Sequence, residues 1–418
     1  MFVMWKKSIL TLTMSALVLA GCGKEKEILT DKKQVEDHVF TVVIEKSDAI
    51  NFESIQASLE ESIKEPVEIK VVSEKEKRAL MISGKADVAL LSQDEIGFTK
   101  DEDLIQEVDY DKEKYLAPTN EAVLYGGKSY AIPGEFDIPV FAYNPSLMAA
   151  PPTTMKNLMG KEKQEEQTYK MTVTRKDKPK EIEKTSNVII PPYITYNDLS
   201  DYSTVYAFLH AYGYTPFKKT NGLYSTHSVN IHSKEVKTAF KTIKELTSSF
   251  LPLDELTSTK LAEMYDTQQL YSFVATKKDL SKLKTPVSYA VIPAIDEKHA
   301  YKPVITVKGW AVMKHVKDKK VISAFAKTVS KKGFVQSQIK ESGTLIPVKM
   351  TWDEQNEYVK TSYEQAKAST ALPILAENRE LTTPTTRALN WYLTDVNELD
   401  DALKNAKQTI DFEIKANY

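Results

Sequence analysis

Residues 39–91 alternate apolar runs with helical patterns, and this alternation constrains the fold more than any other stretch. The strand-like runs are residues 39–44, 67–72 and 86–91, and the helical patterns are 51–64 and 74–82. The runs are rich in valine, isoleucine and leucine, as is typical of buried strands. The helical patterns repeat apolar side chains every three to four residues. Strands that alternate with helices in this way predict an α/β fold with a parallel sheet covered by helices.

A polar segment follows the third predicted strand. Ser92, Gln93 and Asp94 come directly after Leu91. In open parallel sheets, ligands bind beyond the carboxyl ends of the strands. We therefore predict that Ser92, Gln93 and Asp94 lie where a ligand would bind.

Residues 126–154 indicate a passage between two parts of the protein. Gly126 and Gly127 predict a tight turn. Gly127-Lys128-Ser129 is similar to the end of a phosphate-binding loop, but such a loop needs a glycine where this chain has Ala122. We therefore interpret these residues as part of the turn. The polar stretch 134–137 separates two strand-like runs. We predict that 134–137 crosses between two lobes and leaves a carboxylate in the gap.

Two other stretches carry specific expectations. Residues 161–184 are highly charged, and we predict a solvated surface excursion with strand character only within 168–177. Pro384 predicts a break before a helix at 387–393, because proline removes a helical hydrogen bond.

The N-terminus has the pattern of a secretion signal. Lys6 and Lys7 precede a short apolar region at 9–19, too short to span a bilayer. Leu19-Ala20-Gly21-Cys22 then resembles the lipobox of bacterial lipoprotein precursors, in which the cysteine is lipidated. This predicts a signal peptide at 1–21 and a charged tether at 22–37. The protein would then be held by Cys22 at the extracellular face of the membrane, as in Gram-positive bacteria.

Composition excludes several functional classes. The net charge is −2 and no long basic block occurs, so nucleic acid is not expected as a partner. Cys22 is the only cysteine, and the six histidines show no metal-ligand spacing, so we expect no metal and no cofactor. No G-x-S-x-G elbow is present. Sequence alone leaves open a pair of carboxylates at glycosidase distance. The 21 tyrosines suit either core packing or stacking on sugar rings, and both roles stay open.

Residues 127–158 read GKSYAIPGEFDIPVFAYNPSLMAAPPTTMKNL. This stretch resembles the pattern GKLYGLPYTVESLALYYNKDL..PPKTWEEL of the maltose/maltodextrin-binding family of extracellular solute-binding proteins. Further similar segments are 211–246, 303–329 with its Lys308-Gly309-Trp310, 342–348 and 381–410. The resemblance covers essentially the whole chain after the tether.

The resemblance implies a two-lobed, periplasmic-binding-protein-like fold of type II with a ligand cleft between the lobes. Each lobe would be a central sheet covered by helices. Lobe 1 would comprise 38–135 plus 303–340, and lobe 2 would comprise 136–302 plus 341–418. The protein would be a monomer and not an enzyme. It would deliver a maltodextrin-like oligosaccharide to an ABC permease.

Five ligand-binding residues follow from the family motifs. Asp137 matches an acidic site position of the family, and Asp94 matches a polar one. Tyr202 and Trp391 fall near positions that stack on sugar. Trp310 belongs to a matched segment. Two departures concern aromatic faces. Leu91 stands where the family often has an aromatic residue, and Ala275-Thr276-Lys277 replaces a tryptophan-containing turn. The alternatives are a surface lipoprotein of the same fold with a role in sensing or adhesion, a non-sugar ligand, or a cell-surface glycosidase.

Overall fold

The computed structural model describes most of the chain after the N-terminal segment. It describes residues 38–48, 50, 53–158, 163–175, 178–190, 199, 201–220, 223–247, 258–270, 272–350 and 356–418. Residues Val39–Tyr418 form one compact unit, distinct from Met1–His38. Cys22, the predicted signal peptide and the predicted tether lie outside the described residues.

A five-stranded sheet contains the predicted strand–helix alternation. Its order is β2-β1-β3-β14-β6, with β1 (Phe40–Glu45), β2 (Val67–Val72), β3 (Val88–Ser92), β6 (Ile132–Asp137) and β14 (Thr306–Val312). Strands β2, β1 and β3 are parallel, as predicted, and β14 runs antiparallel to both β3 and β6. Because β14 comes from late in the chain, the sheet joins segments that are far apart in sequence.

Helices around this sheet form the first hydrophobic cluster with it. They are α1 (Glu53–Ile63), α2 (Glu74–Ile82), α3 (Gln93–Asp101), α9 (Lys319–Val329) and α10 (Lys332–Ser342). The bounds of α2 agree with the predicted 74–82. Its start is fixed by Ser73, which accepts a hydrogen bond from the Glu76 N–H while the Glu76 carboxylate accepts one from the Ser73 N–H.

The predicted turn and the predicted crossing have different outcomes. Gly126 and Gly127, with φ of 57° and 83°, form the two-residue loop between β4 (Leu124–Tyr125) and β5 (Lys128–Ser129), so the turn is confirmed. The predicted polar break at 134–137 is wrong, because these residues pair with β14 as the end of β6, whereas a crossing between lobes near this point stays a prediction. A Cβ at Gly134 would lie 2.8 Å from Trp310 Nε1, so this glycine fits beneath a core side chain. The chain leaves the sheet at 138–139.

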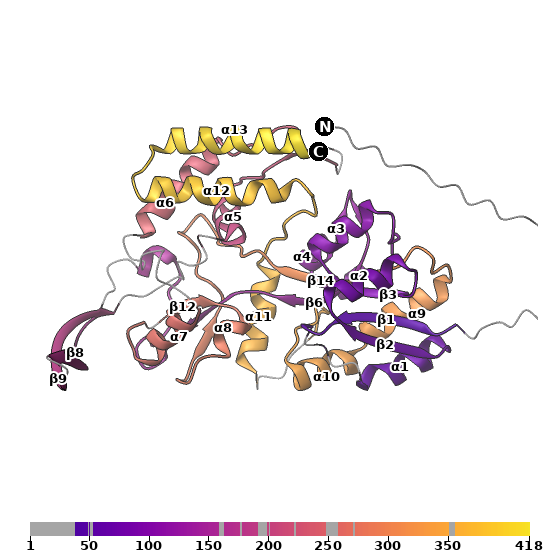
Figure 1. The fold of residues 1–418 in the computed structure, drawn as a ribbon, viewed down its shortest axis with the longest axis horizontal. Helices are drawn as coiled ribbons and strands as arrows, with labels where there is room; N and C mark the ends of the chain where they lie inside the picture. The colour runs from indigo at the N-terminus through magenta and orange to yellow at the C-terminus, as the bar shows by residue number, and fades with distance from the viewer. Residues whose placement is uncertain are drawn as a thin grey trace, which may run out of the picture. The chain divides into compact units, whose positions relative to one another are not determined.

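A three-stranded antiparallel sheet follows, in the order β12-β7-β13. Its strands are β7 (Val140–Tyr143), β12 (Ser272–Ala275) and β13 (Ser288–Ala290). The helices of the second hydrophobic cluster include α5 (Tyr202–Ala211), α6 (Lys234–Thr247), α7 (Ser258–Asp266), α12 (Asn378–Leu393) and α13 (Leu399–Asn417). Figure 1 shows α12 and α13 running alongside each other.

Shorter elements connect these parts. They are η1 (Lys112–Lys114), α4 (Ala117–Glu121), η2 (Met155–Leu158), β10 (Lys218–Thr220), β11 (Leu223–Ser225), α8 (Lys277–Leu280) and α11 (Glu357–Lys367). Two further strands, β8 (Lys163–Arg175) and β9 (Lys178–Ile190), form a long antiparallel hairpin. The prediction placed strand character only within 168–177, because the stretch is highly charged. Two strands can pair through backbone hydrogen bonds without an apolar face, so the charged composition did not reveal the hairpin.

Two expectations about the last third of the chain need comment. Pro384 lies inside α12 and does not end it, because Leu381, Ala388 and Leu389 are buried on one side of that helix and hold it in place. The predicted lobe boundaries remain a prediction. The first hydrophobic cluster contains Phe136 and Ile138, and it also contains buried residues between Leu345 and Ile374 that the resemblance assigned to lobe 2.

Candidate functional site

The carboxyl end of β3 leads directly into helix α3. Ser92 accepts a hydrogen bond from the Glu95 N–H at 3.3 Å, and the Glu95 carboxylate accepts one from the Ser92 N–H at 2.8 Å. This capping box starts the helix one residue after the strand. Asp94 therefore stands in the first turn of α3, exposed, where the positive end of the helix dipole favours a carboxylate.

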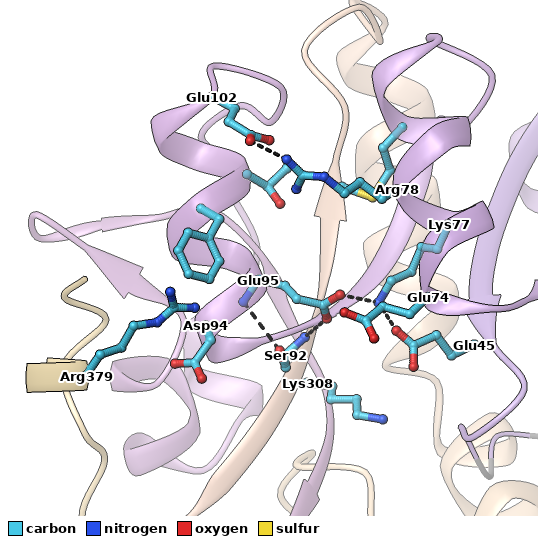
Figure 2. A pocket seen from close by; sticks show the side chains of 13 residues that line it. Glu45, Glu74, Lys77, Arg78, Ser92, Asp94, Glu95, Glu102, Lys308 and Arg379 are labelled. Atoms are coloured by element: carbon cyan, nitrogen blue, oxygen red, sulfur yellow. Dashed lines mark hydrogen bonds and ion pairs between the residues drawn. The ribbon is translucent and has the colours of Figure 1, made fainter. Parts of the chain in front are cut away.

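A cavity of about 640 Å³ opens beside Asp94. We call it the α2–α3 cavity, and Figure 2 shows its lining side chains. Its charged residues are Glu45, Glu74, Lys77, Arg78, Asp94, Glu95, Glu102, Lys308 and Arg379. Such a surface offers many hydrogen-bond donors and acceptors to a polar solute.

Lys77 holds two carboxylates of this cavity together. Its side chain is 3% exposed, and Nζ lies 2.5 Å from Glu45 and 2.7 Å from Glu95. Nζ also donates to the Leu90 carbonyl oxygen at 3.3 Å. Burial raises the pKa of Glu45, but the hydrogen bond and positive charge of Lys77 outweigh it, so the pKa lies below its usual 4.5. Lys77 therefore ties β1, α2 and α3 into one unit.

A second cavity of about 480 Å³ surrounds Asp137, and we call it the Asp137 cavity. Lys308 lines both cavities, so they adjoin at its side chain. Asp137 is exposed to the cavity and accepts a hydrogen bond from the Ile138 N–H at 2.9 Å. Partial desolvation by neighbouring side chains raises the pKa of Asp137, and this hydrogen bond opposes the rise.

Lys308 connects the site to the end of β1. It forms ion pairs with the buried carboxylate of Asp48 and with Glu135, the latter at 3.3 Å. Desolvation alone would lower the pKa of Lys308, but its bond to Asp48 and the charge of Glu135 raise it. Desolvation raises the pKa of Glu135 despite Lys308. A fixed ammonium group thus stands between the two cavities.

Lys277 closes one side of the Asp137 cavity. It stands on α8, and its Nζ donates to the Ser342 carbonyl oxygen at 2.8 Å. Ser342 is the last residue of α10, followed by Gly343 with a φ of 65°. A cation at a helix C-terminus interacts favourably with the helix dipole. Lys277 therefore links α8, which packs beside β12, to α10, which belongs to the first cluster.

The Lys277 link has a measurable consequence. We expect Lys277→Met to lower the free energy of unfolding by about 1 kcal/mol, because one hydrogen bond and one dipole interaction are lost. Lys278→Met is the matched control, since Lys278 is exposed on the same helix and lines the same cavity. Thermal denaturation of both variants checks this. Equal melting temperatures would contradict the link.

The structure brings together two of the five predicted ligand-binding residues. Asp94 and Asp137 line the two adjoining cavities. Trp310 is 1% exposed and packs edge-on against Phe325 in the first cluster, and Tyr202 is 3% exposed in the second. Neither offers a face to a ligand, so the structure corrects both predictions.

The role of Trp391 at a ligand stays a prediction. It stands near the end of α12, with its ring 5.2 Å from the Arg387 guanidinium, and it lines neither cavity. Arg379, which does line the α2–α3 cavity, is 12 residues earlier, about 18 Å along the helix axis.

Sequence reasoning missed the basic residues of the site. Lys77, Lys308 and Arg379 contact or line the cavities, but each looks like an ordinary surface residue in the sequence. One signal was present for Lys308, because it stands in a strand between apolar neighbours. No group of three or more metal-binding side chains occurs among the described residues. In the same residues, no helix is long and apolar enough to cross a bilayer.

Comparison with solved structures identifies the fold. The structure is similar to a cyclo/maltodextrin-binding protein complexed with maltotetraose, with a TM-score of 0.73 and 18% identity over 92% of this chain and 100% of that chain. It is also similar to the maltose-binding periplasmic protein MalE from Listeria monocytogenes in complex with maltose (TM-score 0.72, 17% identity, 91% and 99% covered). The chain has the fold of the maltose- and maltodextrin-binding proteins.

A third structure agrees. It is an extracellular solute-binding protein from Staphylococcus aureus in complex with maltose, with a TM-score of 0.71 and 17% identity over 91% of this chain and 99% of that chain. No protein-family model matches the sequence, and no curated protein is similar to it in sequence. The predicted two-lobed α/β class is confirmed by this binding-protein fold, and the resemblance that predicted it holds at the level of the fold.

Proposed function

We propose that this protein is an extracellular solute-binding protein that captures a maltodextrin-like oligosaccharide. The observation that carries the proposal is the pair of adjoining cavities at Asp94 and Asp137, joined by Lys308, in a chain with a solute-binding fold. Carboxylates accept hydrogen bonds from sugar hydroxyls, and hydrogen bonds with one charged partner are roughly twice as strong as neutral ones. The site therefore favours a ligand rich in hydroxyl groups.

Hydrogen bonds, more than ring stacking, would hold the sugar. The aromatic residues that line the two cavities are Phe98 and Phe136. The Arg379 guanidinium covers the Phe98 ring at 3.9 Å, and Phe136 is 5% exposed. By analogy with base stacking, each missing aromatic face costs about 1–3 kcal/mol of binding. Affinity for long maltodextrins would be correspondingly lower than in a site lined by open aromatic rings.

Anchoring and delivery complete the proposal. The lipobox predicts that Cys22 is lipidated and that the protein stays at the extracellular face of the membrane. The protein would act as a monomer without a cofactor and without catalysis, closing on the sugar and handing it to an ABC permease. The similar proteins with solved structures are binding proteins, which supports a role without catalysis.

A second candidate is a surface lipoprotein of the same fold with a non-sugar ligand or a role in sensing or adhesion. The observation that favours it is the high density of charge in the α2–α3 cavity, together with the absence of an open aromatic face among its lining residues. A charged solute would then replace the sugar.

Isothermal titration calorimetry separates the two candidates. We expect maltose or maltotriose to release heat on binding and to raise the melting temperature, because a ligand that binds only the folded state stabilises it. An assay for released reducing sugar is expected to show no turnover. No heat and no thermal shift with any oligosaccharide would rule out the sugar and leave the second candidate.

A further inference from the structure

The surface of α9 and the start of α10 carries a group of lysines whose ammonium groups form no ion pair with the described residues. Lys319, Lys320, Lys327 and Lys331 line a groove of about 530 Å³, and no acidic residue lines it. All four are exposed, and none forms an ion pair with another described residue. The Lys331 ammonium group donates a hydrogen bond to the Ser62 hydroxyl at 3.4 Å. We call these four residues the lysine face.

A second hollow continues the lysine face. Lys332 follows Lys331 and lines a cavity of about 370 Å³ with Lys114 and Lys349. No acidic residue lines this cavity either, and Lys114 lies 3.8 Å from Asp111 outside it. Like charges that cluster in this way repel one another and destabilise the isolated chain. An anionic partner would relieve the repulsion.

The lysine face lies beside the point where the chain enters its compact unit. That unit starts at Val39, and β1 starts at Phe40. The Phe40 ring packs 6.1 Å from Phe325, on the buried side of α9. The lysine face is on the exposed side of the same helix, so it lies about one helix diameter, roughly 10 Å, from the start of β1.

The ligand site lies at the other end of the same strand. β1 ends at Glu45, which lines the α2–α3 cavity, and the buried Asp48 that follows pairs with Lys308. Six residues of strand span roughly 20 Å. A protein held by the start of β1 therefore presents the lysine face on the attached side and the ligand site on the opposite side.

We propose that the lysine face docks on anionic phospholipid headgroups of a membrane, and this inference rests on the proposed lipid anchor at Cys22. The segment from Cys22 to His38 has 17 residues and reaches at most about 60 Å, which keeps the compact unit close to an anchoring bilayer. Each lysine near an anionic surface strengthens binding roughly fivefold. Docking orients the ligand site away from the bilayer. The proposal is independent of what the ligand site binds.

Vesicle flotation tests the docking surface directly. The full chain carrying Cys22→Ala, which cannot be lipidated, is mixed with vesicles of phosphatidylcholine alone or of phosphatidylcholine with phosphatidylglycerol. We expect tighter binding to the vesicles that contain phosphatidylglycerol, and a loss of that preference at high salt. Substituting all four lysines of the lysine face with glutamine is expected to weaken this binding several-hundredfold. Circular dichroism confirms that each variant is folded.

The matched control changes the net charge by the same amount elsewhere. Lys218, Lys298, Lys404 and Lys415 are exposed lysines outside α9 and α10, and substituting all four with glutamine is expected to weaken binding far less. Equal losses in the two quadruple variants would overturn the proposal. So would equal binding of the Cys22→Ala chain to both kinds of vesicle, or binding to soluble polyphosphate without binding to anionic vesicles.

Discussion

Replacing Trp310 with alanine is expected to lower the free energy of unfolding by about 3–5 kcal/mol. Trp310 is 1% exposed in β14, its ring is 5.7 Å from that of Phe325, and Gly134 lies directly beneath its Nε1 atom. Alanine would leave a large cavity that a sheet held on both sides by β3 and β6 cannot close. Urea denaturation followed by circular dichroism measures the loss.

Trp391→Ala is the matched control for Trp310. Trp391 is half-buried near the end of α12 and contacts Arg387, so its loss is expected to cost about 1 kcal/mol. Trp310→Ala should not change sugar affinity at a temperature where it is folded. A Trp310→Ala protein that keeps its stability but loses sugar binding would show that Trp310 faces the ligand and that its placement in the core is wrong.

Replacing Lys77 with methionine is expected to cost about 3 kcal/mol of stability at neutral pH. Removing one partner of a buried ion pair leaves an uncompensated charge, which costs roughly 3–5 kcal/mol, and the partial exposure of Glu45 and Glu95 reduces that amount. Lys75→Met, on the exposed side of the same helix, is the matched control and is expected to be nearly neutral.

The cost of Lys77→Met depends on pH in a defined direction. Pairing holds the pKa of Glu45 below 4.5, so the pairing stabilises the fold above that pH, and the contribution is lost as the pH falls through the folded-state pKa. The difference between the parent chain and the variant should therefore be largest near pH 7 and shrink below about pH 4.5. A difference that stays constant from pH 7 to pH 3 would contradict the role of Lys77.

The parallel part of the fold was predictable because local and tertiary signals agree there. The β-branched runs became β1, β2 and β3, and the helix 74–82 became α2 with its predicted bounds. Pro384 and the β8–β9 hairpin were not predictable, since packing of α12 overrides a proline and strand pairing overrides a charged composition. In both cases the contacts that decide the structure involve residues outside the short stretch from which a helix or strand is predicted.

The site was predictable only in part. Asp94 and Asp137 stand where strands end, a position that the strand pattern itself indicates. Tyr202 and Trp310 were predicted to bind the ligand, but both are buried. An aromatic residue has the same sequence signal whether it packs in a core or stacks on a ligand. Lys308 and Lys77 were missed because the carboxylates that hold them come from other strands and helices.

We propose that the sugar binds in the Asp137 cavity. Calorimetric titration of Asp137→Ala with maltotriose tests this most directly. Losing a charged acceptor that bonds a sugar hydroxyl costs about 1.5–3 kcal/mol, so we predict an affinity roughly tenfold to a hundredfold lower than that of the parent chain. Asp109→Ala, which removes an exposed carboxylate that lines neither cavity, should bind like the parent. If the parent binds maltotriose and Asp137→Ala binds it equally well, the sugar lies elsewhere and the site proposed at Asp137 is wrong.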